Sequence, residues 1–319
     1  MSTTSTHSSV KYHQVSDDEA GQRIDNFLLR LLKGLPRSRV YRLLRRGEVR
    51  VDGGRAKPTR RLQAGEVVRL PPVVIADSEH KPRPEPSSGL ERALRDGVLY
   101  EDERLLVIDK PSGLAVHGGS TVKIGLIEAL RQIRSDLHFV ELVHRLDQET
   151  SGCLLLAKRR STLRRLHEML RNGDIEKRYT ALLVGEVKQP EQVIDAPIEK
   201  LAGAGHERLV RVSQRGRSAQ TLVKVISQSP YGTLVDIKLT TGRTHQIRVH
   251  ARHIGHPVAG DDRYGERQSN SRLRTELGLR RLFLHANELA FRHPEQGNRL
   301  HVQAPLSAEL NKVLTNAMK

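Results

Sequence analysis

Residues 144–157 read HRLDQETSGCLLLA, a polar segment that runs directly into an apolar one. The apolar half predicts a strand buried on both faces, because its residues are hydrophobic without alternation. The polar half predicts a loop that carries Asp147, with Arg145 two residues earlier. Taken alone, such an aspartate has two interpretations, a turn residue that bonds the backbone or a functional carboxylate on a rigid scaffold.

The sequence on both sides of this segment predicts a mixed α+β domain. An apolar strand over residues 105–108 ends in the turn-forming residues 109–113, and residues 126–133 and 163–170 have helical apolar spacing. Apolar residues alternate over 221–225 and 235–239, which is typical of half-buried antiparallel strands. Strands and helices do not alternate regularly, so the pattern favours a mainly antiparallel sheet over a doubly wound one.

The amino-terminal part predicts a separate small domain. Two short helices are predicted on either side of Gly34-Leu35-Pro36, and Gly47 ends the second, before two short strands. Residues 76–89 combine prolines with polar residues, a composition that cannot form a core and stiffens a spacer. We therefore predict that the chain has four parts: a disordered tail at 1–20, a small domain at 21–75, a linker at 76–90 and a large domain at 91–319.

The charge is concentrated in the small domain. The chain has 54 Lys plus Arg and 37 Asp plus Glu, a net charge of +17, which indicates a polyanionic partner. Between Arg23 and Arg69 we count 14 basic residues and four acidic ones, an excess of ten. Arg39, Arg42 and Arg46 share one face of the second helix, away from its apolar residues. A solvated helix normally mixes charge signs, so we predict that these arginines contact nucleic acid.

Several classes of protein are not expected. No run of 18 apolar residues suits a membrane helix, and residues 1–20 lack the apolar run of a secretory signal. Cys153 is the only cysteine, which excludes an intrachain disulfide, and its apolar surroundings predict a core residue. Neither a phosphate-binding glycine loop nor a strong metal-ligand spacing of histidines is present, so we predict no cofactor and no metal. We expect a cytoplasmic protein.

Four segments together identify a resemblance to a known family. They are DKPSGLAVH at 109–117, HRLDQETSG at 144–152, KRYTAL at 177–182 and GRTHQIRVH at 242–250. In this order they resemble the motifs of the RluA family of RNA pseudouridine synthases. The basic module resembles the S-four-like RNA-binding domain that some members carry at the amino end. The resemblance implies a cofactor-free isomerase that converts uridine in RNA to pseudouridine.

The resemblance also implies roles for individual residues. Asp147 is the essential carboxylate, Arg243 pairs with it, and Tyr179 stacks on the base and helps to remove the proton at carbon five. Arg145 fills the gap left by an extruded uridine, and Ile247 forms part of the pocket wall. Lys110 and His117 match motif positions without an assignable chemical role.

The chemistry of this reaction suits a carboxylate. The bond between base nitrogen and sugar must break, the uracil must turn, and its carbon five must join the sugar. An ionised carboxylate can attack the sugar, attack the ring, or remove a sugar proton, and the sequence leaves these three routes open. Extruding the uridine costs a few kcal/mol, and least where the base is already unpaired.

The resemblance, together with DDRYG at 261–265, points to the branch that acts on 23S ribosomal RNA of the large subunit. The expected partner is that RNA or a large-subunit assembly intermediate, with no membrane partner and a monomeric enzyme. Two alternatives remain open. One is a non-catalytic RNA-binding or ribosome-assembly factor, which would not need Asp147, Tyr179 and Arg243. The other is a synthase of the same family that acts on transfer RNA.

Overall fold

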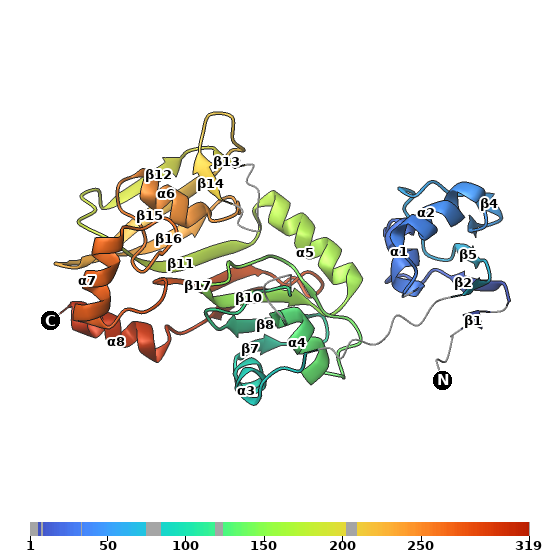
Figure 1. Cartoon of the computed structure of the whole chain (residues 1–319), viewed down its shortest axis with the longest axis horizontal. Coiled ribbons are helices and arrows are strands. Elements are labelled where there is room, and N and C mark those ends of the chain that lie inside the picture. The colour runs from blue at the N-terminus through green and yellow to red at the C-terminus, as the bar shows by residue number, and fades with distance from the viewer. Residues whose placement is uncertain are drawn as a thin grey trace. The chain divides into compact units, whose positions relative to one another are not determined.

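The structure is a computed structural model that describes residues 6–7, 9–32, 34–74, 84–118, 124–201 and 209–318. It divides into two compact units, Met1–Pro84 and Glu85–Lys319. Each unit has its own helices and sheet (Figure 1).

The amino-terminal unit packs two helices against a small antiparallel sheet. The helices are α1 (Ile24–Leu31) and α2 (Arg37–Arg46), and Gly47 ends α2 in the left-handed conformation with φ 70°. The strands are β1 (Thr6–His7), β2 (Lys11–Gln14), β3 (Arg50–Val51), β4 (Gly54–Arg55), β5 (Val67–Leu70) and β6 (Val73–Val74). Four of them form a sheet in the order β2-β5-β3-β4, and β1 pairs with β6. Its core includes Phe27, Leu28 and Val40, which are fully buried.

The unit differs in two places from the predicted tail and linker. Residues 1–20 were expected to be a disordered tail, but β2 pairs antiparallel with β5 and Val15 is buried. The sequence of β2 lacks the apolar alternation that marks a strand. The strand is instead held by its backbone pairing with β5. Residues 1–5 and 8 lie outside the described residues. Of the predicted linker 76–90, residues 76–83 also lie outside them, and helix α3 (Ser88–Asp96) already begins inside its end.

The second unit is built on one large sheet. Its strands are β7 (Val98–Glu101), β8 (Leu105–Lys110), β9 (Glu141–Leu142), β10 (Ser151–Ala157), β11 (Glu176–Leu183), β12 (Glu191–Asp195), β15 (Gln220–Ser229), β16 (Gly232–Leu239), β17 (Leu284–Arg292) and β18 (Arg299–Gln303). The order is β12-β15-β16-β11-β17-β10-β8-β7, with β18 beside β17 and β9 beside β10. Among the described strands, β10 and β17 alone pair in parallel. The predicted α+β class with a mixed, mainly antiparallel sheet is confirmed.

Helices and one hairpin complete the second unit. The helices are α3, α4 (Leu126–Ile133), α5 (Arg160–Asn172), α6 (Gln246–His253), α7 (Arg267–Leu277) and α8 (Ala308–Ala317). The hairpin is formed by β13 (Ile198–Lys200) and β14 (Val210–Val212). The described residues contain no helix that is long and apolar enough to cross a membrane.

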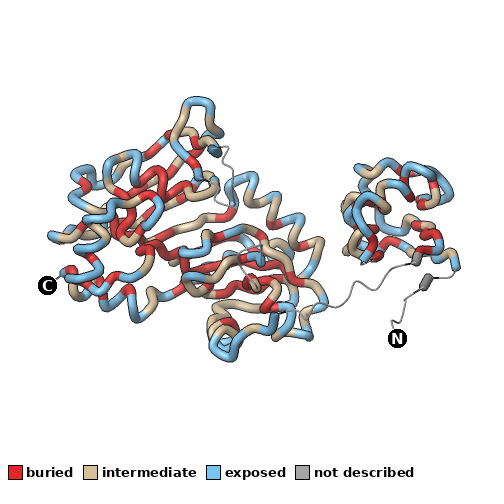
Figure 2. The backbone as a smooth tube through the Cα atoms, in the orientation of Figure 1, coloured by how far each residue is buried: buried red, intermediate tan, exposed pale blue. Residues whose placement is uncertain are grey.

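Strand β10 is buried on both faces, as its continuous apolar sequence predicted. Leu154 and Leu156 belong to a core cluster with residues of α4, whereas Cys153 and Leu155 belong to another cluster with Leu166 of α5. The buried residues concentrate along the central strands (Figure 2). Cys153 is fully buried, which confirms its prediction as a core residue, and burial raises the pKa of its thiol to about 12.

Glycine is required where β10 begins beside β17. Gly152 has φ 108°, and a Cβ there would lie 2.2 Å from the carbonyl oxygen of Ala286 in β17. Residues other than glycine are strained at such a φ, and this close contact leaves no room for a side chain. This close approach lies at the start of β10, directly after the polar loop that carries Asp147.

Candidate active site

The loop that carries Asp147 is held by a buried lysine. Lys110, at the end of β8, donates from Nζ to the carbonyl oxygens of Pro111 at 2.9 Å, Leu114 at 2.8 Å and Gln148 at 2.9 Å. Its three N–H groups thereby tie the turn after β8 to the residue after Asp147, and burial lowers the pKa of Lys110 to about 7. This gives Lys110 a positioning role, for which the sequence alone offered no assignment.

A second set of buried hydrogen bonds holds the end of the same loop. Arg281 Nη2 donates to Ser151 Oγ at 2.7 Å, and Ser151 Oγ lies 2.8 Å from His285 Nδ1. His285 Nε2 lies 3.1 Å from the carbonyl oxygen of Ala304, so Nε2 carries the proton and Nδ1 accepts from Ser151. Ser151 and His285 are only 4% and 1% exposed, so this serine–histidine pair cannot meet a substrate.

Asp147 lines a cavity of about 740 Å³ in the second unit. Its wall is formed by the loop 142–150 and by residues of α5, β11 and the segment 239–248. Among the described lining residues Asp147 is the one carboxylate, and the basic residues are Arg145, Arg171, Lys177, Arg243, Arg248, His117, His144, His167 and His245. This distribution of charge suits a polyanionic ligand.

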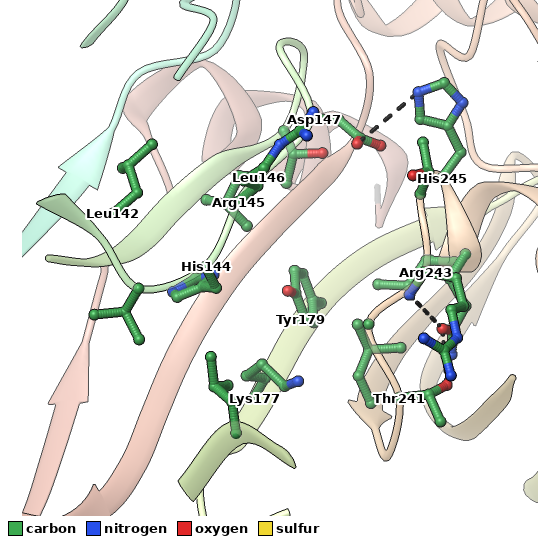
Figure 3. Close-up of a pocket in the computed structure, with 18 of the residues that line it drawn as sticks. Leu142, His144, Arg145, Leu146, Asp147, Lys177, Tyr179, Thr241, Arg243 and His245 are labelled. Atoms are coloured by element: carbon green, nitrogen blue, oxygen red, sulfur yellow. Dashed lines mark hydrogen bonds and ion pairs between the residues drawn. The ribbon is translucent and has the colours of Figure 1, made fainter. Parts of the chain in front are cut away.

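The cation that faces Asp147 is Arg248, and the expected pairing with Arg243 is wrong. Arg248 Nη1 lies 3.7 Å from Asp147 Oδ2. Arg243 is exposed, and its Nε donates to the carbonyl oxygen of Ser218 at 3.1 Å. Figure 3 shows the Arg243 side chain directed away from Asp147. The reason is local, because His245 turns the chain with φ 52° and α6 begins after it, which brings residue 248 to the cavity.

Arg248 is fixed from behind by Asp261. Its Nε and Nη2 donate to the two carboxylate oxygens of Asp261, both at 2.7 Å. Although burial opposes it, this bidentate pair raises the pKa of Arg248 above its usual value. Asp261 also accepts from the backbone N–H groups of Arg263 and Tyr264, both at 2.9 Å. The segment DDRYG therefore supplies the residue that orients Arg248, a role that the sequence did not reveal.

A histidine also faces Asp147. His245 Nε2 lies 3.9 Å from Asp147 Oδ1, and its Nδ1 lies 2.8 Å from the hydroxyl of Tyr264. The Tyr264 hydroxyl accepts from the backbone N–H of Val210 at 3.3 Å, which leaves its own proton for Nδ1. The remaining ring proton of neutral His245 then lies on Nε2 and points to Asp147. Burial lowers the pKa of His245, partly opposed by the charge of Asp147.

Tyr179 projects from β11 into the same cavity, between Asp147 and Lys177 (Figure 3). It is 6% exposed, and its hydroxyl makes no hydrogen bond with any described residue. Burial and the charge of Asp147 raise the pKa of the Tyr179 phenol, so it stays protonated at neutral pH. A protonated phenol is a proton donor rather than a base.

The other predicted site residues lie in two places. Arg145 is exposed at the cavity, and Ile247, 5% exposed, lines its wall. Arg39, Arg42 and Arg46 lie on α2 in the amino-terminal unit, on the side away from the buried Val40, Leu43 and Leu44. Within the described residues, no group of three potential ligands could hold a metal ion.

Comparisons with known proteins agree with this arrangement. Residues 104–253 match the family model described as RNA pseudouridylate synthase, and residues 22–68 match that of the S4 domain. The chain is 50% identical over 307 residues to ribosomal large subunit pseudouridine synthase C of Pasteurella multocida (strain Pm70), covering 96% of this chain and 93% of that protein. It is 50% identical over 308 residues to the protein of the same name from Escherichia coli (strain K12), with 96% of each covered.

A solved structure is also similar. Human RNA pseudouridylate synthase domain containing 4 has 28% sequence identity and a TM-score of 0.60, covering 72% of this chain and 96% of that one.

Proposed function

Because the chain belongs to the RNA pseudouridylate synthases, isomerases that act on RNA, we propose that it converts specific uridines of 23S ribosomal RNA to pseudouridine. The observation that carries the proposal is Asp147, the one carboxylate among the described residues of a basic cavity, with Arg248 opposite it. The relatives named for the large ribosomal subunit support that RNA as the substrate. Either the free RNA or a large-subunit assembly intermediate fits this proposal, and we propose that the enzyme acts as a cytoplasmic monomer.

Asp147 is the reacting carboxylate in this proposal. The bond from N1 to the sugar breaks, the uracil turns, and C5 joins the sugar. N1 then gains a proton, and the proton at C5 is lost. Attack on the sugar, attack on the ring and removal of a sugar proton each need the ionised carboxylate. Arg248, held by Asp261, supplies the opposite charge beside it, and all of the chemistry proceeds without a cofactor.

The other residues bind and place the RNA. Tyr179 stacks on the extruded uracil, and its raised pKa opposes the role of base for the C5 proton that the family resemblance implied. Ile247 closes the wall beside the base, and Arg145 fills the space that the uridine leaves in the RNA. Arg39, Arg42 and Arg46 of the amino-terminal unit contact RNA phosphates, because α2 contains five arginines and no acidic residue.

Sequencing of carbodiimide-treated ribosomal RNA tests the proposed substrate. Cells that lack this protein are expected to lose the carbodiimide-dependent stops at a small set of large-subunit uridines and to keep all others. The wild-type gene should restore these stops, whereas the Asp147→Asn gene should not. An unchanged pattern in the large-subunit RNA, with stops lost from transfer RNA instead, would contradict the proposal.

Removing residues 1–84 tests the division of work between the units. The remaining unit has its own cores, so we expect it to fold and to isomerise uridine but to bind RNA more weakly. Each lost phosphate contact reduces the slope of log affinity against log salt concentration by roughly 0.7–0.9. The measurements are RNA affinity at several salt concentrations and single-turnover rates at saturating enzyme.

A full-length variant provides the matched comparison for the truncation. Arg39→Gln, Arg42→Gln and Arg46→Gln, combined in one chain, keep the fold of α2 because these side chains lie off its buried face. This variant should reproduce a large part of the reduced slope. Equal slopes for the wild type and both variants would mean that the amino-terminal unit does not touch the RNA backbone.

A further inference from the structure

The cavity continues past Tyr179 on the side away from Asp147. Tyr179 and Lys177 are alternate residues of β11, and both line the cavity. Figure 3 shows Tyr179 between Asp147 and Lys177. A uridine that reacts at Asp147 and stacks on Tyr179 leaves the Lys177 end free for a neighbouring part of the RNA chain.

Lys177 is a half-buried cation without a counter-charge. It makes no ion pair or hydrogen bond with any described residue, and burial lowers its pKa. Its Nζ lies 3.8 Å from the point that a Cβ on Gly242 would occupy, which places it under the segment 239–248. The neighbouring His144 is neutral, because burial lowers its pKa to about 4 and its Nε2 accepts from the N–H of Leu155 at 3.1 Å.

On the opposite side of β11, by contrast, the charged side chains form ion pairs. Arg178 contacts Glu176 at 2.8 Å, Asp236 at 2.6 Å and Glu288 at 3.9 Å. Lys238 of β16 contacts Glu176 at 3.2 Å. Because a poorly solvated charge is costly unless it is paired, the unmatched Lys177 on the cavity side indicates a ligand that brings a negative charge.

Helix α5 adds two further basic residues to the lining of the same cavity, His167 and Arg171. Arg171 lies in the last turn of α5, where a positive charge also stabilises the helix dipole. Lys177 lies in a strand and has no such structural reason, so the inference rests on Lys177. The anionic groups of an RNA chain are its phosphates, and a phosphate oxygen can accept hydrogen bonds from an ammonium group.

We propose that Lys177 binds a phosphate of the substrate RNA next to the target uridine, in a cavity that Arg171 and His167 also make basic. This phosphate subsite rests on the proposed function, because it takes RNA as the ligand. It fixes the RNA chain on the far side of Tyr179 while Asp147 reacts on the near side.

The Lys177→Met variant tests the subsite, with Lys177→Arg as the conservative variant. The control is Lys224→Met, the same substitution at an exposed residue of β15 that does not line the cavity. The probe is large-subunit ribosomal RNA transcribed in vitro, and the readouts are its dissociation constant at several salt concentrations and the single-turnover rate at saturating enzyme. Loss of one charged contact should weaken binding by roughly 10–100-fold and reduce the salt slope by about 0.7.

The expected pattern distinguishes the subsite from a structural or a chemical role. In Lys177→Met the saturating rate should stay close to that of the wild type, and the thermal midpoint should not fall, because methionine removes a poorly solvated charge that no described residue matches. Lys177→Arg should keep most of the affinity, and Lys224→Met nearly all of it. Unchanged affinity and slope in Lys177→Met would overturn the proposal. So would a lower saturating rate with full affinity, or weak binding that accompanies loss of folding.

The binding readout does not depend on turnover. If the wild-type enzyme forms no pseudouridine in this RNA, the proposed function fails, while the difference in affinity and slope between the variants still decides whether Lys177 contacts a phosphate.

Discussion

Asp147→Asn is expected to reduce the single-turnover rate of pseudouridine formation by roughly 10⁴-fold or more. The amide keeps the shape of the side chain but loses the charge that all three routes need. The measurement is tritium release from RNA that carries uridine labelled at C5, with enzyme in excess over RNA.

Folding and RNA affinity should survive this substitution. The Asp147 carboxylate accepts no hydrogen bond from a described residue, and its loop is held instead by Lys110 and by the N–H of Thr150, which donates to the Asp147 carbonyl at 3.1 Å. Asp262→Asn is the matched control, because Asp262 is exposed and does not line the cavity. Substantial turnover in well-purified Asp147→Asn would remove Asp147 from its proposed role.

Arg248→Met should lower the saturating rate by roughly 10²–10³-fold, the loss that follows removal of one preorganised charged group from an active site. It also leaves Asp261 buried without its partner. Breaking such a buried pair costs about 3–5 kcal/mol, so the thermal midpoint should fall as well. Arg248→Lys keeps the charge but not the bidentate geometry, and it should give an intermediate rate.

Arg243→Met is the decisive comparison for Arg248. Arg243 is exposed and bonds a backbone carbonyl, so its loss should mainly weaken RNA binding while the saturating rate stays within about threefold of the wild type, as expected for an interaction that does not change in the transition state. Combining Arg248→Met with Asp261→Asn removes the unpaired carboxylate and should recover stability but not rate. A larger loss of saturating rate in Arg243→Met than in Arg248→Met would reverse the assignment of the cation that serves Asp147.

The contrast between Arg243 and Arg248 shows how far a sequence motif can be interpreted. Both arginines lie in the segment 242–250, and the motif alone cannot tell where α6 begins. The conformation of His245, with φ 52°, decides which arginine reaches Asp147. By comparison, Tyr179 and Ile247, which the family resemblance assigned to the site, both line the cavity with Asp147.

Long-range contacts were beyond prediction from the sequence for a simple reason. The partners of Ser151 and Lys110 are backbone or side-chain atoms up to 134 residues away, and no periodicity encodes such pairs. The buried strand β10 was predicted, since a continuous apolar run needs no knowledge of its partners. Strand β2 was missed because its four residues, Lys11–Gln14, have no apolar pattern and are held by backbone hydrogen bonds to β5.

The burial of Cys153 makes this chain a natural background for site-specific chemistry. Thiol reagents react with the exposed thiolate, and the only native thiol is fully buried with its pKa raised to about 12. A cysteine introduced on an exposed position of either unit is therefore the single accessible thiol in the folded protein. Fluorophores, spin labels or RNA crosslinkers can be attached there without first removing a residue from the core.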